Sequence, residues 1–293
     1  MMTAISPDPK LRKLIENAAH AASTLCWSCS SCDLECPVNI ATSRLRPQKI
    51  VRMANLGCLD ELLSLPEIWY CLTCRHCNNV CPNLVKPAAL ISYSRENAIL
   101  GHKVSQETIL RYKDLFSRFQ RVRWHTAARC LRGEAGVISE RQWYDWLETP
   151  VEKSGEKISD RNLFSGSEAF RNAVGYSGTA SCFTCGECGS ACPVMCEQSV
   201  FDPRVIFRMV NLGLAEELLR SPSIWLCIGC ERCAMACSQL VKGDVIIRRL
   251  QEMALNEGFA DSDFPFRWYE AHKAIYPRLL EEIDKVFGFS SGS

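Results

Sequence analysis

Apolar residues recur at helical spacing in two stretches of the chain, which predicts a pair of helices in each. In the first stretch, Pro47 suits the first turn of a helix and Gly57 suits the position just past its end. Its apolar face has a spacing of three residues and consists of Ile50, Met53 and Leu56. A shorter helix is expected next, ending before Pro66, with an apolar side made of Leu59, Leu62 and Leu63. Residues 203–221 repeat the whole pattern.

The middle of the chain predicts one long helix over residues 105–131. Its broad apolar face consists of Ile109, Leu110, Tyr112, Leu115, Phe116 and Phe119. The same stretch is rich in basic residues, namely Arg111, Lys113, Arg118, Arg121, Arg123, Arg129 and Arg132. Two hypotheses fit this bias, a solvated helix face and a docking site for an acidic redox partner. The stretch "EKSGEKISD" at residues 152–160 is typical of a solvated loop.

Composition adds an unusual feature, since 19 of the 293 residues are cysteine. A chain of this length can bury a sizeable core without disulfides, and it is not a short secreted scaffold. Sixteen of the cysteines form four blocks with the spacing C-x2-C-x2-C-x3-C. The blocks are Cys26, Cys29, Cys32, Cys36; Cys71, Cys74, Cys77, Cys81; Cys182, Cys185, Cys188, Cys192; and Cys227, Cys230, Cys233, Cys237.

The four blocks belong to an internal duplication with an offset of 156 residues. Residues 26–81 and 182–237 align without a gap, and 24 of the 56 positions are identical. Because a ligand must recur in both copies, the duplication separates ligands from packing residues. Cys58 and Cys196 have apolar counterparts and Cys130 has none, so these three are expected to be packing residues.

The repeated spacing indicates iron–sulfur clusters. Each [4Fe–4S] cluster takes four thiolates, and in two-cluster ferredoxins the fourth cysteine of this run ligates the other cluster. Cysteines two residues apart can wrap three corners of a cubane while backbone amides turn toward it. The predicted sets are Cys26, Cys29, Cys32, Cys81; Cys71, Cys74, Cys77, Cys36; Cys182, Cys185, Cys188, Cys237; and Cys227, Cys230, Cys233, Cys192. Structural zinc and disulfides are the alternatives.

A 34-residue spacer of helical character separates Cys36 from Cys71. This length favours an all-α frame over the short linkers and hairpins of bacterial ferredoxins. We therefore predict tandem α-helical ferredoxin domains, each with two [4Fe–4S] clusters and four in all, joined by a helical connector. The expected boundaries are residues 1–105 for the first unit, 106–175 for the connector and 176–293 for the second unit.

Each half resembles the HdrC family, which comprises iron–sulfur subunits of heterodisulfide reductases. The matching motifs are "EIWYCLTCRHCNNVCP" in the first half, and "CFTCGECGSACP" with "SIWLCIGCERCAMAC" in the second. The resemblance implies two fused HdrC-like units that relay electrons between a flavin-containing (HdrA-like) subunit and a cysteine-rich catalytic (HdrB-like) subunit. The catalytic partner of that family carries paired adjacent cysteines, and this sequence has no Cys-Cys dipeptide.

The leading hypothesis is therefore an electron-transfer subunit of an oxidoreductase complex, with no substrate active site of its own. The alternatives are an iron–sulfur redox sensor or scaffold, and a structural zinc module. Trp69 and Trp225 each lie two residues before a cluster cysteine and are expected to shield the cofactor from water.

The remaining expectations concern location and partners. A net charge of +1 gives no case for nucleic acid as the main partner. No stretch approaches 18 apolar residues, so we expect no transmembrane segment. Together with the free thiols, this predicts a cytoplasmic protein.

Overall fold

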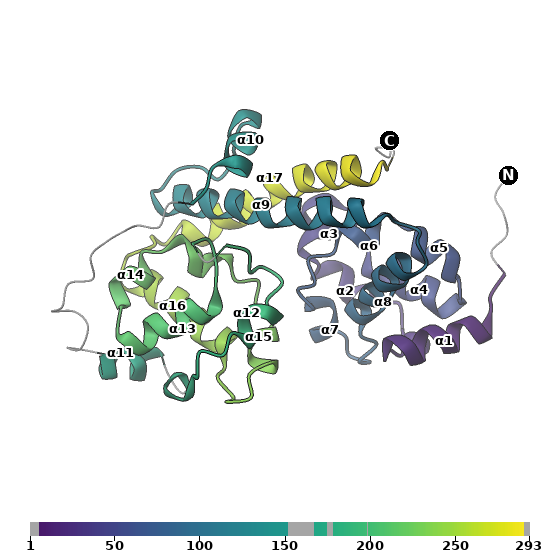
Figure 1. Cartoon of the computed structure of the whole chain (residues 1–293), viewed down its shortest axis with the longest axis horizontal. Coiled ribbons are helices and arrows are strands. Elements are labelled where there is room, and N and C mark those ends of the chain that lie inside the picture. Colours follow the sequence, from purple (N-terminus) through teal and green to yellow (C-terminus); the bar gives the residue numbers. More distant parts are fainter. Residues whose placement is uncertain (1–5, 152–166, 175–177, 198, 290–293) are drawn as a thin grey trace. The chain divides into compact units, whose positions relative to one another are not determined.

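The computed structural model describes residues 6–151, 167–174, 178–197 and 199–289, and these residues form helices and no β-strand. The all-α prediction is therefore confirmed (Figure 1). The chain divides into two compact units, the first comprising Met1–Leu115 with Ile275–Ser293 and the second Phe116–Ala274. The division falls within α9 (Gln106–Leu131) and within α17 (Phe264–Phe287). The domain boundaries expected from the sequence stay a prediction, and the loop expected at 152–160 lies outside the described residues.

The first unit contains the predicted helix pair. Helix α4 (Pro47–Leu56) begins with Pro47, and Gly57 follows it with a left-handed φ of 74°. Helix α5 (Leu59–Ser64) then ends before Pro66. Gly57 is required for two reasons, because a Cβ atom there would adopt a strained backbone and would lie 2.1 Å from the carbonyl oxygen of Asp8. Asp8 caps α1 (Pro9–Ala19), accepting from the backbone N–H groups of Lys10 and Leu11.

Three longer helices form the core of the first unit. Helix α4 packs against α8 (Pro87–Leu100), and α1 packs against both. Fully buried aliphatic side chains fill the space between them, among them Ile15, Ile50, Leu62, Leu90 and Ile91. Shorter elements carry or flank the cysteines: η1 (Ser23–Leu25), α2 (Ser31–Leu34), α3 (Pro37–Thr42), α6 (Glu67–Tyr70) and α7 (His76–Asn79).

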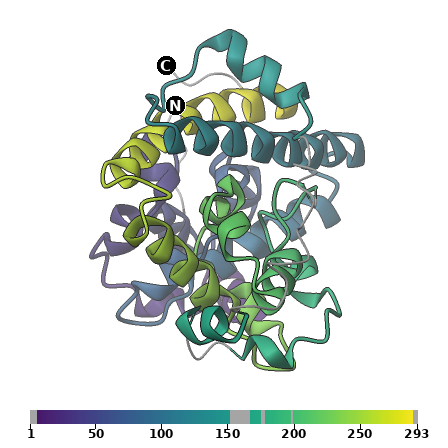
Figure 2. The same cartoon turned by 90° about the vertical axis from the view of Figure 1, so that its left-hand side faces the viewer.

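The second unit repeats this arrangement. Helix α13 (Pro203–Leu212) again begins with proline and ends at a left-handed glycine, Gly213, and α14 (Ala215–Leu219) follows it. Helix α16 (Gly243–Asn256) corresponds to α8, and both groups of helices are visible in the turned view (Figure 2). The other elements are α10 (Glu140–Glu148), α11 (Ser167–Val174), η2 (Thr179–Ser181), α12 (Glu187–Ala191), η3 (Pro222–Leu226) and α15 (Arg232–Met235). The core contains Phe201, Phe207, Ile246, Leu250 and Phe264.

Helix α9 is the long helix that the middle of the sequence predicts. Ile109, Leu115 and Phe119 are buried on it as expected. The assignment of Leu110 to the apolar face is wrong, because this side chain is 60% exposed. Its place in the sequence beside Ile109 turns it about 100° away from the buried stripe.

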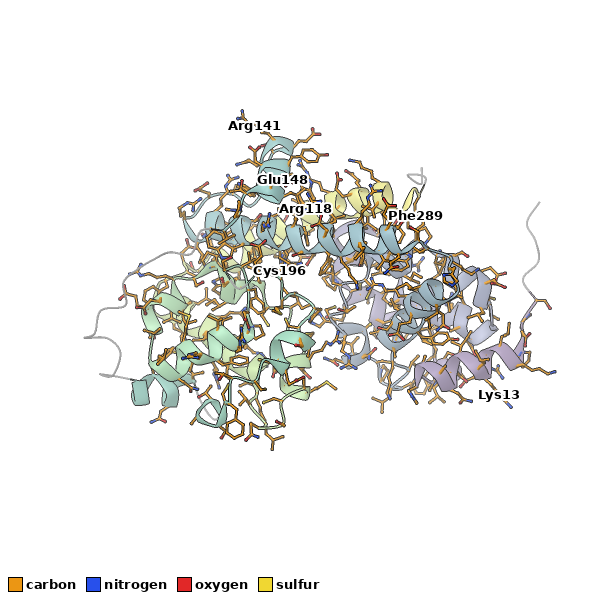
Figure 3. The ribbon with its side chains drawn as sticks, viewed as in Figure 1. Lys13, Arg118, Arg141, Glu148, Cys196 and Phe289 are labelled. Atoms are coloured by element: carbon orange, nitrogen blue, oxygen red, sulfur yellow. The ribbon has the colours of Figure 1, made fainter. Side chains whose placement is uncertain are left out.

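The basic residues of α9 are largely engaged inside the second unit. Arg118 pairs with Glu148 of α10 (Figure 3), and Arg121 pairs with Glu197. Arg129 and Arg132 both pair with Glu134. These contacts satisfy much of the positive charge that suggested either a solvated face or a docking site. Cys130 is fully buried in the core of this unit, which supports its expected packing role.

Candidate metal centres

Four cavities in the described part of the chain are each lined by a set of four cysteines. The structure brings together Cys26, Cys29, Cys32 and Cys81 in one cavity, and Cys36, Cys71, Cys74 and Cys77 in another. In the second unit the sets are Cys182, Cys185, Cys188, Cys237 and Cys192, Cys227, Cys230, Cys233. Cys233 also borders the Cys182 cavity. The cavity volumes lie between 320 and 390 Å³, which suits the same occupant in all four.

The groupings match the crossed sets that the spacing predicts. The fourth cysteine of each block leaves its own loop and faces the cavity of the paired block. Cys36 does so because it caps α3, whose first residue is Pro37, and the chain turns there. Cys71 and Cys227 directly follow the short elements α6 and η3, so the packed tryptophan segments fix where the inner loops begin.

We name the four cavities by the exposure of their cysteines. The outer cavities are those lined by Cys29 and Cys185, which are exposed to solvent. The inner cavities are those lined by Cys74 and Cys230, which are buried. In the first unit all four cysteines of the inner cavity are buried, so its occupant would be the more protected from water.

The backbone of the four loops turns in the same way. Left-handed φ values occur two residues after the first cysteine and again one residue after the second. In the first unit these residues are Ser28, Ser30, Thr73 and Arg75, and in the second unit Thr184, Gly186, Gly229 and Glu231. Such alternation turns successive N–H groups toward one side and makes an anion-binding concavity.

Several of these loop residues are conformationally costly. The β-branched Thr73 and Thr184 have φ values of 57° and 55°, where a non-glycine residue costs about 1–3 kcal/mol. The Thr73 N–H donates to Sγ of Cys71 over 3.3 Å, and the Thr184 N–H donates to Sγ of Cys182 over 3.4 Å. The strained conformation therefore aims amide groups at sulfur.

Burial sets the proton affinity of the thiols. It raises the pKa of Cys36, Cys192 and Cys233 to about 12, and the pKa of Cys188 and Cys227 to about 11. Neighbouring thiols add to the effect, since a second thiolate in the same cavity repels the first. Without metal these thiols hold their protons at neutral pH, and a cationic group must displace the protons in order to bind.

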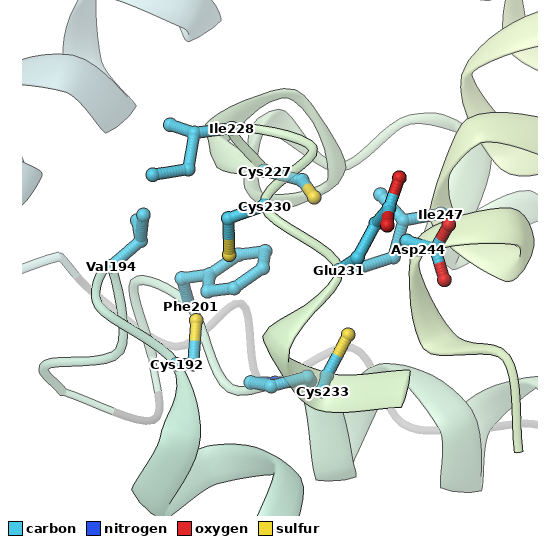
Figure 4. A pocket seen from close by; sticks show the side chains of 11 residues that line it. Cys192, Val194, Phe201, Cys227, Ile228, Cys230, Glu231, Cys233, Asp244 and Ile247 are labelled. Atoms are coloured by element: carbon cyan, nitrogen blue, oxygen red, sulfur yellow. The ribbon is translucent and has the colours of Figure 1, made fainter. Parts of the chain in front are cut away.

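The donor set fits an iron–sulfur cluster. In the described ranges, no three His, Cys, Asp or Glu side chains are arranged to hold a single metal ion. The four thiols instead surround a cavity, as Figure 4 shows for Cys192, Cys227, Cys230 and Cys233. Four soft thiol ligands, inward N–H groups and apolar walls are what a [4Fe–4S] cluster requires.

Trp69 and Trp225 do not line any of the four cavities. Trp69 is buried and packs against Tyr112 and Phe287, and Trp225 is buried against Phe264. Both therefore support the segment that leads into the inner loop. A direct role of either ring toward a cofactor stays a prediction.

Sequence reasoning missed a polar contact behind each inner loop. Arg95 of α8 donates to the carbonyl oxygens of Ile68 and Cys71 over 2.5 and 2.6 Å. Its counterpart at the same offset is Gln251, whose Nε2 donates to the carbonyl oxygen of Ile224. The offset of 156 could have paired the two positions, although their different side chains hide the shared role.

A second missed feature lies next to Cys71. Tyr70 donates to Oδ1 of the buried Asp284 over 2.5 Å, and Arg44 donates to Oδ2 of the same carboxylate over 2.7 Å. Burial and the neighbouring carboxylate raise the pKa of Tyr70. The second unit has Leu226 and Val200 at the positions of Tyr70 and Arg44, so this network is not duplicated.

Comparison with known proteins agrees with this geometry. The 4Fe-4S dicluster domain family matches the chain twice, at residues 22–85 and 178–241. Two such domains give the chain four [4Fe–4S] clusters in total. No helix in the described ranges combines the length and apolarity needed to span a bilayer.

Curated relatives are of one kind, the HdrC type. The chain is 33% identical over 91 residues to the HdrC-type subunit of the H(2):CoB-CoM heterodisulfide,ferredoxin reductase of Methanothermobacter thermautotrophicus, covering 31% of this chain and 49% of the relative. It is 34% identical over 93 residues to an HdrC-type iron-sulfur subunit of the CoB–CoM heterodisulfide reductase of Methanocaldococcus jannaschii, covering 30% and 49%. An HdrC-like protein of Archaeoglobus profundus is 28% identical over 80 residues, covering 27% and 43%. The chain spans about half the length of the relatives it matches.

Proposed function

From a chain that is an iron–sulfur electron-transfer subunit similar to HdrC of heterodisulfide reductases, with two tandem dicluster domains, we infer a four-cluster relay. We propose that it works in a cytoplasmic heterodisulfide reductase-like oxidoreductase complex. In that complex it passes electrons between a flavin-containing (HdrA-like) subunit and a cysteine-rich catalytic or acceptor (HdrB-like) subunit. The sixteen cysteines that recur in the duplication are the proposed ligands.

The exchange of one thiol between paired loops carries this proposal. Cys32 lines the outer cavity and Cys36 the inner cavity, although only four residues separate them. Their Cα atoms are thus at most ~14 Å apart by the reach of the chain. Cys77 and Cys81 impose the same limit from the other loop. Two groups held this way are neighbours by construction, which suits transfer between them.

The chain's own residues supply protection and orientation. When bound, a [4Fe–4S] cluster accepts and donates single electrons. Around the inner cavity of the first unit, Val38, Leu45 and Ile91 form an apolar wall that excludes water. The outer cavities lie nearer to solvent through Cys29 and Cys185, so we assign electron entry and exit to them. Trp27 and Phe183, at equivalent positions, are exposed beside these two cavities.

Electron counting tests the relay. Anaerobic protein is reduced with a one-electron viologen donor, reoxidised with a one-electron acceptor, and cycled several times while absorbance and protein-bound iron are followed. A relay predicts up to four electrons per chain in every cycle without loss of iron. A redox sensor or scaffold predicts fewer exchangeable electrons, or iron loss at the first oxidation, and either result would contradict the proposal.

A further inference from the structure

The inner cavity is built twice from equivalent residues, yet the charges on its wall differ. Arg75 lines the first inner cavity, and the residue 156 positions later is Glu231, which lines the second. Asp244 also lines the second inner cavity, and its counterpart in the first unit is Ala88. The first wall therefore carries one positive charge and the second carries two negative charges. Figure 4 shows both carboxylates on one side of the second cavity.

Charges behind the two walls nearly offset each other. Arg95 in the first unit donates to the carbonyl oxygen of Cys71. In the second unit the buried Arg123 partly offsets the effect of burial on the pKa of Cys227. Each inner loop thus has one arginine beside its first cysteine, and neither unit gains an advantage from it.

Two further ion pairs reduce the contrast without reversing it. Asp244, whose side chain is 12% exposed, lies 3.5 Å from the exposed guanidinium of Arg248. In the first unit, Asp33 lies near Cys36 and is held 3.3 Å from Arg46. After these pairs are set against each other, the reversal of charge between Arg75 and Glu231 remains.

We propose that the cluster held by Cys36, Cys71, Cys74 and Cys77 has a higher reduction potential than its counterpart held by Cys192, Cys227, Cys230 and Cys233. The inference rests on the proposed function, because it requires clusters in both inner cavities. Reduction adds one negative charge, which Arg75 stabilises and which Glu231 and Asp244 oppose. At this range one unit charge changes the equilibrium constant for reduction on the order of tenfold, which is about 59 mV for a one-electron couple.

The higher potential biases where an electron resides in the chain. When an external one-electron donor gives up one electron, the chain gains one, and no bond forms or breaks. At equilibrium that electron occupies the inner site of the first unit in preference to the inner site of the second. The wall charges thus assign the first unit to the acceptor end of the relay.

The duplication offers substitutions that fit the backbone. Arg75 has φ 62° and ψ 7°, and Glu231 has φ 61° and ψ 1°, so each position already accommodates the other residue's conformation. Glu231→Arg and Arg75→Glu therefore exchange charge at a matched site. Asp244→Ala copies Ala88. Glu187→Ser copies Ser31 and is the control, because Glu187 lines the outer cavity.

The test is a redox titration of the full anaerobic protein followed by EPR, with iron and sulfide measured in each variant. Glu231→Arg and Asp244→Ala are expected to raise one and the same midpoint potential, about tenfold or more in the equilibrium constant for reduction. Arg75→Glu is expected to lower a different midpoint, which in the unmodified protein is the higher of the two. Glu187→Ser should leave both unchanged.

Two results overturn the inference on its own. One is that the midpoint raised by Glu231→Arg already exceeds the midpoint lowered by Arg75→Glu in the unmodified protein. The other is that neither substitution moves any midpoint while sixteen iron ions per chain, four for each cluster, are retained. Protein without four clusters would instead overturn the proposed function, so the two failures are distinguishable.

Discussion

Removal of Cys36 tests the crossed arrangement of thiols at a single atom. This cysteine belongs to the first block by sequence, but it lines the cavity of Cys71, Cys74 and Cys77. Cys36→Ala should therefore empty the inner cavity of the first unit and leave the outer cavity of the same unit filled. The expected loss is one cluster of four, or a quarter of the iron per chain.

The structure also gives the cost to folding. Cys36 is 7% exposed, and its truncation removes one buried sulfur atom, which costs about 1–2 kcal/mol by analogy with other small deletions in cores. A domain has about 5–15 kcal/mol of stability, so the variant should stay folded. Cys58→Ala is the matched control, because Cys58 is equally buried and lines none of the four cavities.

The assay is alkylation of free thiols followed by mass spectrometry. In the Cys36→Ala variant, Cys71, Cys74 and Cys77 should become reactive, while Cys26, Cys29, Cys32 and Cys81 stay protected. In Cys58→Ala all sixteen proposed ligands should stay protected. If Cys36→Ala instead exposed Cys26, Cys29 and Cys32, the crossed arrangement would be refuted.

Three further predictions concern pH, backbone and the buried network. Because burial raises the pKa of the free thiols to about 11–12, apoprotein binds more protons than holoprotein, so cluster loss to a chelator should accelerate as pH falls from about 8 to about 6; a loss rate independent of pH would contradict this. Gly57→Ala should destabilise the holoprotein to chemical denaturant by at least ~2 kcal/mol more than Gly133→Ala, since both have positive φ but only Gly57 is crowded by backbone; equal losses would refute the clash. Tyr70→Phe should cost about 1–3 kcal/mol by removing a donor from buried Asp284, whereas Tyr269→Phe at the surface should change the free energy of unfolding by less than ~0.5 kcal/mol, and equal effects would argue against the network.

Local signals in the sequence were enough for the helix pairs and the ligand sets. Pro47, the three-residue apolar spacing and Gly57 determine where α4 begins and ends, because each acts within one turn of the helix. The cysteine sets followed from spacing, since a fourth thiol three residues further on is carried out of its own loop. The duplication then separated Cys58, Cys130 and Cys196 from the ligands.

Contacts between distant segments left no such signal. Asp284 belongs with the first unit because it accepts from Tyr70, which lies 214 residues earlier, and no local pattern predicts that pairing. The exposure of Leu110 likewise depends on which neighbours cover α9, so residue type alone assigned it wrongly. The opposite charges at Arg75 and Glu231 are visible in the sequence, but only the cavities show that both face a candidate cluster.

Iron and acid-labile sulfide per chain, measured on anaerobically purified protein with an EPR redox titration of the same sample, test the central claim most directly. The four-cluster relay predicts sixteen of each, with fast-relaxing signals from clusters that interact in pairs. Zinc in place of iron, or iron for only one pair of clusters, would contradict it.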